Sequence, residues 1–172
     1  MYRSRYEAYP FLCDAGNDLR CDFELCTDEM SSMTGMLRTQ IKDKALREEL
    51  TWINGFIYNI NPTLRTFMSV TDEEIEQLAG ITEGLKDQCI GRCERFVLPQ
   101  GSEAACMAHM LRVKAKMLVR LLYRHAEQGN KIPDTLFDAA NLLSGYFFYL
   151  ALYLNKTEDV DEIPFISRNY KL

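Results

Sequence analysis

Four basic side chains recur at four-residue intervals in the second half of the chain, namely Arg112, Lys116, Arg120 and Arg124. On an α-helix each four-residue step turns the side chain by only about 40°, so these cations would form one stripe, here called the basic stripe. His109 lies one turn before it. Several cations in a row suit a polyphosphate better than a single carboxylate, so the pattern indicates an anion site.

The same pattern also fits a structural role. The segment around the stripe is apolar almost all round, which favours a buried helix. Buried cations must be paired, and carboxylates such as Asp28 or Glu29 would then be their partners. Alternatively, the stripe simply faces water. Ion pairs within proteins are common, so the pattern alone leaves these interpretations open.

A second polar run interrupts an otherwise apolar segment near the end of the chain, at Asp138, Asn141, Ser144 and Gly145. Glycine inside a helix costs about 1 kcal/mol relative to alanine, so Gly145 predicts a close approach to another group. Close packing of two helices is the simpler explanation, and a bound ligand is the alternative.

No metal site is predicted. Cys89 and Cys93 have the spacing of neighbours on a helix, but no third and fourth ligand lies nearby in the sequence. The six cysteines contain no Cys-x-x-Cys pair and are typical of reduced thiols in a cytosolic protein. The sequence also lacks a glycine-rich phosphate loop and the motifs of serine hydrolases and zinc proteases.

Composition narrows the class of protein. The chain has 172 residues, with 20 Lys and Arg against 25 Asp and Glu, a net charge of −5. Without a basic tract, general nucleic-acid binding is not expected. The most apolar stretch, residues 142–154, is too short to span a bilayer, and residues 1–18 do not form a signal peptide. We therefore expect a soluble, cytoplasmic protein without a membrane partner.

Three amphipathic helices are predicted in the first half of the chain. Thr27 is expected to cap the first, because the acidic residues that follow suit the positive end of a helix dipole. Apolar residues at helical spacing run over residues 46–60, and Pro62 ends this second helix. Thr71 and Glu74 have the spacing of a capping box, which predicts the start of a third helix.

Two further helices follow a loop. Proline and glycine in Phe96–Gly101 oppose helix and predict an extended segment. Ser102 is expected to cap the fourth helix, which carries the basic stripe and ends near Gln128. The last helix covers about residues 134–155. Five helices with short connections predict an all-α fold, a five-helix up-and-down antiparallel bundle.

The chain is expected to form a single domain with three parts. Residues 1–26 would be an irregular N-terminal segment, residues 27–155 the helical bundle, and residues 156–172 a polar C-terminal tail that wraps around the bundle or hangs loose.

The loop and the fourth helix resemble a known family, the ATP:cob(I)alamin adenosyltransferases of the propanediol-utilisation type. The central block of this family reads Phe-x-Leu-Pro-Gly-Gly-Ser/Thr, then Leu-His-x-x-Arg. The corresponding blocks here are Phe96-Val97-Leu98-Pro99-Gln100-Gly101-Ser102 and His109-Met110-Leu111-Arg112. Phe96 stands 112 − 96 = 16 residues before Arg112, which agrees with the family spacing.

Two more blocks occur in the family's order. Asp18-Leu19-Arg20, followed by residues 28–35, is similar to the family's Asp-Leu-Arg and Asp-Glu-Leu-Asn-Ser-x-x-Gly. Residues 140–148 are similar to the family's Leu-Asn-Arg-Leu-Ser-Asp-Tyr-Leu-Phe. Three blocks in order are more specific than any one of them.

The resemblance implies a fold, an assembly and a reaction. The fold would be the ferritin-like five-helix bundle of this family, assembled as a homotrimer with active sites between subunits. The reaction would transfer the 5′-deoxyadenosyl group of ATP to the cobalt of a reduced corrinoid such as cobalamin, with release of triphosphate and with Mg²⁺ sharing the phosphate charge. Protein partners would be a flavoprotein reductase or a cobalamin-dependent enzyme.

The resemblance also implies roles for particular residues. Phe96 would displace the lower axial ligand of cobalt. Asp28 and Arg112 would form the family's salt bridge between helices at the active site. The residues implied to contact ATP or the corrinoid are Lys116, Arg120, Asn141, His109 and Ser102.

The departures from the family pattern lie mainly on the ATP side. The family's Thr-Gly-Asp-x-Gly nucleotide loop has no counterpart before Asp18, Lys116 stands in place of an arginine, and Gln100 replaces a glycine. The alternative function is therefore a corrinoid-binding or carrier protein on the same fold, without adenosyl transfer. A further alternative is an interaction bundle with no small-molecule site.

Overall fold

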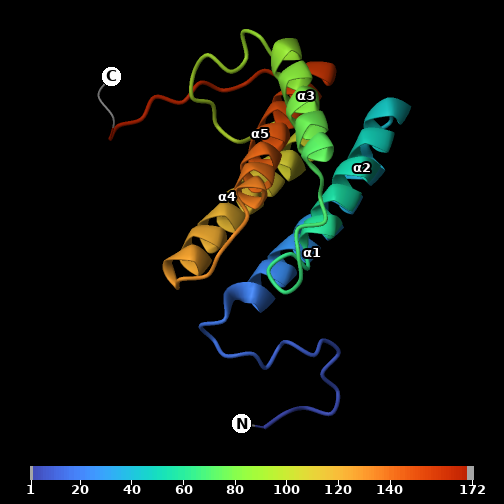
Figure 1. Cartoon of the computed structure of the whole chain (residues 1–172). Helices are drawn as coiled ribbons and strands as arrows, with labels where there is room; N and C mark the ends of the chain where they lie inside the picture. The colour runs from blue at the N-terminus through green and yellow to red at the C-terminus, as the bar shows by residue number, and fades with distance from the viewer. Residues whose placement is uncertain (1, 170–172) are drawn as a thin grey trace.

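Five α-helices form the protein in a computed structural model, which describes residues 2–169 (Figure 1). The helices are α1 Leu19–Gln40, α2 Lys44–Ile60, α3 Asp72–Gln88, α4 Glu103–Glu127 and α5 Asp134–Thr157. Within residues 2–169 the one β pairing is an isolated bridge between Val97 and Pro164. The prediction of an all-α five-helix fold is confirmed.

Local capping signals begin α3 and α4 at the predicted places. The Thr71 hydroxyl accepts a hydrogen bond from the backbone of Glu74, whose carboxylate accepts one from the backbone of Thr71, so the predicted capping box is present. Ser102 Oγ accepts a hydrogen bond from the Ala105 backbone at 3.2 Å and caps α4. Each cap satisfies backbone donors that the first turn leaves unpaired.

The predicted start of the first helix is wrong. α1 begins at Leu19, capped by Asp18, whereas Thr27 is buried in the middle of the helix. The Thr27 hydroxyl donates to the backbone oxygens of Phe23 and Glu24 instead of capping a helix. Leu19 and Phe23 are buried, so the apolar face of α1 begins about two turns before the predicted cap at Thr27.

Neighbouring helices in space are not always neighbours in sequence. α4 packs against α5 and α1, whereas α3 packs against α5 and α2 against α1. Residues 89–102 carry the chain from α3 across to the start of α4, so this connection is longer than the predicted short ones (Figure 1). The core between the helices contains large aromatic side chains that solvent does not reach, among them Tyr146, Phe23 and Phe147.

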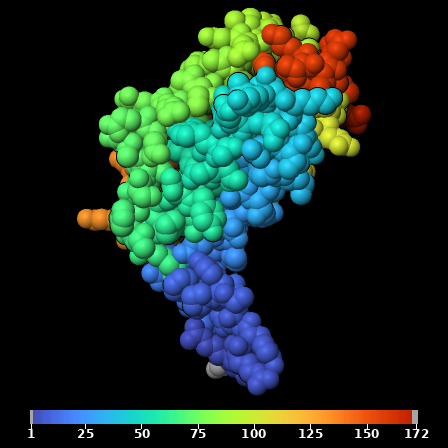
Figure 2. All heavy atoms as spheres, turned by 90° about the vertical axis from the view of Figure 1, so that its right-hand side faces the viewer, coloured from blue at the N-terminus to red at the C-terminus, as the bar shows by residue number. Residues whose placement is uncertain are grey.

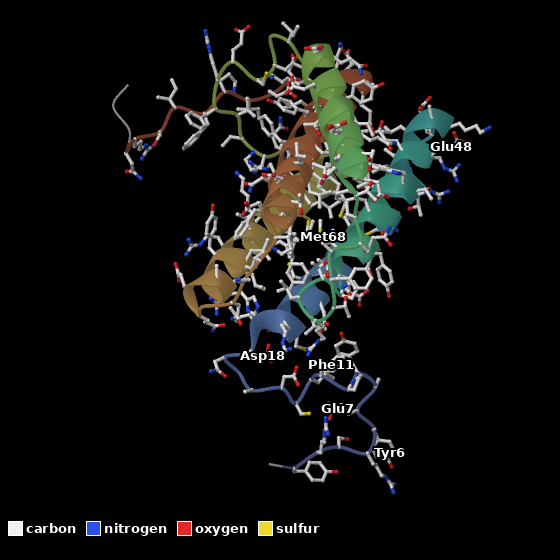
Figure 3. All side chains as sticks on the ribbon, viewed as in Figure 1. Tyr6, Glu7, Phe11, Asp18, Glu48 and Met68 are labelled. Carbon is white, nitrogen blue, oxygen red and sulfur yellow. The ribbon has the colours of Figure 1, made fainter. Side chains whose placement is uncertain are left out.

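The N-terminal segment has no helix before Leu19 and projects from one end of the bundle (Figure 2). One cation holds it there. The Arg65 guanidinium lies 3.6 Å from the centre of the Phe11 ring and bonds to Asp14 at 2.8 Å and to buried Glu24 at 2.5 Å. Phe11 therefore lies at the same end of the bundle as Asp18, where α1 begins (Figure 3).

The C-terminal tail runs back along the connection that precedes α4 (Figure 1). Backbone hydrogen bonds join residues 163–165 to this connection, and beyond it the tail runs away from the helices (Figure 1). Met1 and residues 170–172, which belong to the predicted terminal segments, lie outside the described residues. None of the helices in residues 2–169 combines the length and the apolar character needed to cross a membrane.

Candidate active site

The basic stripe lies on the outward side of α4, and its cations have no acidic partner. Arg112 is half-buried and the other three members are exposed. Across residues 2–169, no carboxylate lies within 4.0 Å of any of the four. The ion pair between α1 and α4 instead joins Glu29 to Lys114, which is not a member of the stripe. Pairing of the stripe with protein carboxylates is therefore not observed.

Arg112 is the member of the stripe that is taken furthest out of water. Its Nε atom is buried and has no hydrogen-bond partner among the described residues. The guanidinium carbon lies 5.9 Å from the ring centre of Phe148, a weak cation–π contact that supplies no counter-charge. Burial lowers the pKa of Arg112, although the side chain stays charged at neutral pH. An anion at this position would stabilise the guanidinium.

The salt bridge between Asp28 and Arg112 is not formed within the chain. Asp28 is exposed on α1 and makes no ion pair with Arg112. Neighbouring residues on a helix point about 100° apart, and Glu29 is the residue of the two that faces α4. A salt bridge between Asp28 of one subunit and Arg112 of another stays a prediction.

Two aromatic contacts show the register of α4 against α5. Arg112 lies over Phe148, and the Tyr123 and Phe137 rings lie 4.9 Å apart. From Arg112 to Tyr123 and from Phe137 to Phe148 the spacing is eleven residues, about three helical turns, so each pair lies on one face of its helix. The seam between the two helices therefore runs from one contact to the other.

Lys116 and Asn141 lie along this seam. Lys116 is one turn after Arg112, and Asn141 is one turn after Phe137, so both fall between the two contacts. Both side chains are exposed. Asn141 Nδ2 donates to the backbone oxygen of Phe137 at 2.8 Å, which leaves its Oδ1 available to a ligand. Arg112 and Lys116 thus lie on the part of α4, and Asn141 on the part of α5, that the two contacts bracket.

Close packing does not require glycine at position 145. A Cβ atom at this position would lie 3.6 Å from Thr82 Cγ2 of α3, an ordinary van der Waals contact. The prediction that Gly145 permits an unusually close approach of two helices is therefore wrong.

His109 is buried beside the stripe. Neither ring nitrogen has a hydrogen-bond partner among the described residues. Burial, with a smaller contribution from the nearby Arg112 charge, lowers the pKa of His109 to about 4. The imidazole is therefore neutral at pH 7 and adds no charge to the stripe. Ser102, the other predicted contact at this end of α4, already uses its hydroxyl as the helix cap.

A groove of about 510 Å³ lies on the other side of the stripe, between α1 and α4. Its lining combines the cations Lys116, Arg120 and Arg124 with apolar Val113 and Met117. This apolar part was missed, because the sequence of α4 predicted burial all round. Instead Met110, Val113 and Met117 are exposed in the single chain and follow one another at helical spacing.

Phe96 lies on the connection between α3 and α4. Its side chain is 75% exposed, whereas its backbone oxygen accepts a hydrogen bond from the Phe165 backbone at 2.7 Å. Leu98 donates to the backbone oxygen of Ile163 at 2.9 Å. The predicted extended segment is present, and the C-terminal tail pairs with it.

Comparison with known proteins gives the family. The sequence profile described as cobalamin adenosyltransferase matches residues 16–154. The chain belongs to the cobalamin adenosyltransferase family. The match covers all three sequence blocks and confirms the predicted family and enzyme class, a corrinoid adenosyltransferase. Residues 1–15, where the family's nucleotide loop was not found, lie outside the match.

Solved structures show the same fold. The chain is similar to PduO-type ATP:corrinoid adenosyltransferases from Lactobacillus reuteri, represented by three variants. The phenylalanine-to-histidine variant, complexed with cobalamin and ATP, has 22% identity and a TM-score of 0.76 over 90% of this chain and 87% of that chain. The phenylalanine-to-alanine variant, also complexed with cobalamin and ATP, has 20% identity and a TM-score of 0.75 over 88% of each chain.

An arginine-to-lysine variant complexed with ATP has 22% identity and a TM-score of 0.76, over 87% of this chain and 88% of that chain. Comparison with the curated proteins gives no significant match.

The burial of His109 can be tested by its titration. In a His125→Gln variant, which leaves a single histidine, the His109 NMR signal should titrate near pH 4. The unfolded chain binds the proton near pH 6.5, so stability should fall as the pH drops from about 6.5 to 4. His109→Gln should flatten this fall in a urea titration series. A signal that titrates near pH 6.5 would show that the ring is solvated.

Proposed function

We propose that this chain transfers the 5′-deoxyadenosyl group of ATP to the cobalt of a reduced corrinoid. Cob(I) attacks C5′, a cobalt–carbon bond forms, and the C5′–O bond breaks, so that triphosphate leaves with the electron pair. The observation that carries the proposal is the desolvated Arg112 guanidinium at the head of an unpaired basic stripe, in a member of this family.

The basic stripe would hold the triphosphate. Arg112 and Lys116 stand one turn apart on α4, so a phosphate chain along this helix could contact both, and Asn141 on the neighbouring α5 would be a third contact. Cations fixed before the reaction stabilise the charge that develops on the leaving group, and their fixed positions align C5′ with cobalt. Lys116 contributes a point charge without the planar fork of arginine.

Mg²⁺ would arrive with the nucleotide. Residues 2–169 contain no group of three or more histidine, cysteine or acidic side chains arranged to hold a metal ion. Mg²⁺ is commonly held by phosphate oxygens and water with few protein ligands, which fits this arrangement.

Phe96 would face the lower side of the corrinoid. An exposed phenyl ring on a backbone that the tail holds can fill the position of the lower ligand without offering a ligand atom of its own. Cob(I) is itself a strong nucleophile, so the protein's contribution is placement and exclusion of water.

We propose a homotrimer in which the exposed apolar residues of α4 lie at subunit contacts. Large apolar patches on a surface mark interaction sites, and Met110, Val113 and Met117 form one beside the stripe. Such an assembly would bring Asp28 of one subunit, which is exposed, to Arg112 of another, which has no acidic partner. The protein would work in the cytoplasm, where its six free thiols stay reduced, with a flavoprotein reductase or a cobalamin-dependent enzyme as partner.

One observation favours a corrinoid carrier as the second candidate. The family match begins at residue 16, and residues 1–17 do not contain the family's Thr-Gly-Asp-x-Gly motif. A carrier would keep the corrinoid contacts and lose those to ATP.

The visible spectrum separates the candidates. With cob(II)alamin, a reductant and ATP, the wild-type chain should give the spectrum of adenosylcobalamin. Phe96→Ala should reduce the rate at least tenfold, because the lower ligand is no longer displaced, while circular dichroism shows an unchanged helical bundle. A shift to the base-off form without product would support the carrier, and no spectral change would exclude both.

The stripe is tested through ATP. Arg112→Ala should raise the KM for ATP about 10- to 100-fold, since charge-assisted hydrogen bonds contribute about 1.5–3 kcal/mol. The KM of Arg112→Lys for ATP should lie between those of the wild type and Arg112→Ala. Arg47→Ala, which removes an exposed arginine of α2, is the matched control. Equal KM values for Arg112→Ala and the control would remove Arg112 from the ATP site.

The assembly is tested by sedimentation. The wild-type protein should have about three times the chain mass of 19.9 kDa. Val113→Glu should give monomers, because a charge would be buried at the contact. Tyr58→Glu, at an exposed aromatic residue of α2, should leave the trimer intact. A wild-type monomer would show that the α4 face is not a subunit contact.

A further inference from the structure

One buried amide joins the end of α5 to the loop that carries Phe96. The Asn155 side chain is fully buried, and all of its contacts go to the loop or the tail. Its Oδ1 accepts from the Ser102 backbone at 3.1 Å. Its Nδ2 donates to the Gln100 backbone oxygen at 3.1 Å and to Glu162 Oε1 at 3.3 Å. Buried amides of this kind are costly to leave unpaired, so the network specifies one arrangement.

The loop is shaped to receive this amide. Gly101 has a φ of +136°, a backbone conformation that disfavours other residues, and a Cβ there would lie 1.8 Å from Asn155 Oδ1. Gln100, which replaces a family glycine, has no positive φ. Its side chain instead donates to the Asp161 backbone oxygen at 2.9 Å, so the replacement adds a contact to the tail.

Glu162 contacts both Asn155 and Arg92, which lies at the other end of the loop. Its second carboxylate oxygen accepts from Arg92 at 2.5 Å, and Arg92 also donates to the Val160 backbone oxygen at 2.9 Å. Tail residues 160–162 are thus held at both ends of the loop, and three residues further on the Phe165 backbone bonds to Phe96.

We propose that Asn155, acting through Glu162 and the tail, is the positioning residue for Phe96. This inference rests on the proposed function. The Phe96 ring has few contacts of its own, since it is largely exposed, so its place depends on where the backbone is held. An ordered backbone reduces the loss of conformational entropy that fixing the ring would cost when the corrinoid binds.

The inference has a specific chemical consequence. Placement of Phe96 matters most when a tethered lower base must be displaced from cobalt. It matters less for a corrinoid that lacks this base. A defect in positioning therefore changes the ratio of rates on the two substrates, whereas partial unfolding lowers both rates equally.

The test compares cobalamin with cobinamide, a corrinoid without the lower base. Asn155→Ala should lower kcat on cobalamin at least tenfold and on cobinamide no more than about threefold, with the KM for ATP within about twofold of wild type. It should also reduce the four-coordinate cob(II) signal of bound cobalamin. Asn59→Ala, an exposed asparagine of α2, is the matched control and should change none of these quantities.

A double variant that exchanges the amide and the carboxylate between positions 155 and 162 should restore the cobalamin rate. Asn155→Asp keeps the acceptor for Ser102 but faces Glu162 with a second carboxylate, so it should be as impaired as Asn155→Ala. Adding Glu162→Gln restores a donor between the two side chains and should recover at least half of the cobalamin rate. Glu162→Ala, which removes the contacts to Arg92 and Asn155 without changing a helix, gives the same comparison should Asn155→Ala unfold.

The outcomes separate the inference from the proposed function. Equal losses on both corrinoids, or no rescue in the double variant, would overturn the positioning role while transfer by the wild-type chain stands. A wild-type chain that makes no product from either corrinoid would overturn the proposed function, and the positioning role with it.

Discussion

The packing of α4 against α5 is the constraint on which the candidate active site depends. Both helices bury alanines, including Ala108 and Ala151, and the distance between packed helices depends on the size of the side chains at their contact. Because the two helices are antiparallel, their packing brings the start of α4 to the end of α5 and sets Arg112 against Phe148. The packing of these two helices therefore positions both the Phe96 loop and Arg112.

The basic stripe of α4 has no acidic partner among the described residues of the single chain. Lys114 has an acidic partner on α1, but the basic stripe on the same helix has none among residues 2–169. Leaving a partly desolvated guanidinium such as Arg112 unmatched costs stability that a purely structural helix would gain by pairing it. The cost is understandable where the counter-charge comes from a substrate or another subunit, as strained or unsatisfied groups often mark functional sites.

Sequence patterns predicted the features that depend on local chemistry. Thr71 and Ser102 cap helices as expected, because a cap involves only the next three residues. The basic stripe followed from helical periodicity. The start of α1 was mispredicted because threonine can cap a helix or donate a hydrogen bond to an earlier carbonyl of its own helix, as Thr27 does. Only the burial of Leu19 and Phe23 distinguishes these two roles.

Contacts between distant segments could not be predicted in the same way. A single asparagine at the end of an apolar helix indicates a helix end, and nothing nearby in the sequence connects Asn155 with Ser102. The outward apolar side of α4 was equally ambiguous, because burial in a core and burial against another subunit require the same residues. The pairing of Phe96 with Phe165 depends on a fold that already brings the tail to the loop.

The chemistry of Pro164 limits how firmly the tail and loop are joined. Proline has no N–H group, so the bridge from Val97 to Pro164 cannot grow into a longer ladder at this residue. Two backbone hydrogen bonds flank it on an exposed surface. Such a junction can separate at a free energy far below that of global unfolding, since no core residue has to move. The tail can thus separate from the loop locally while the five helices stay folded and Asn155 still holds Gln100 and Ser102.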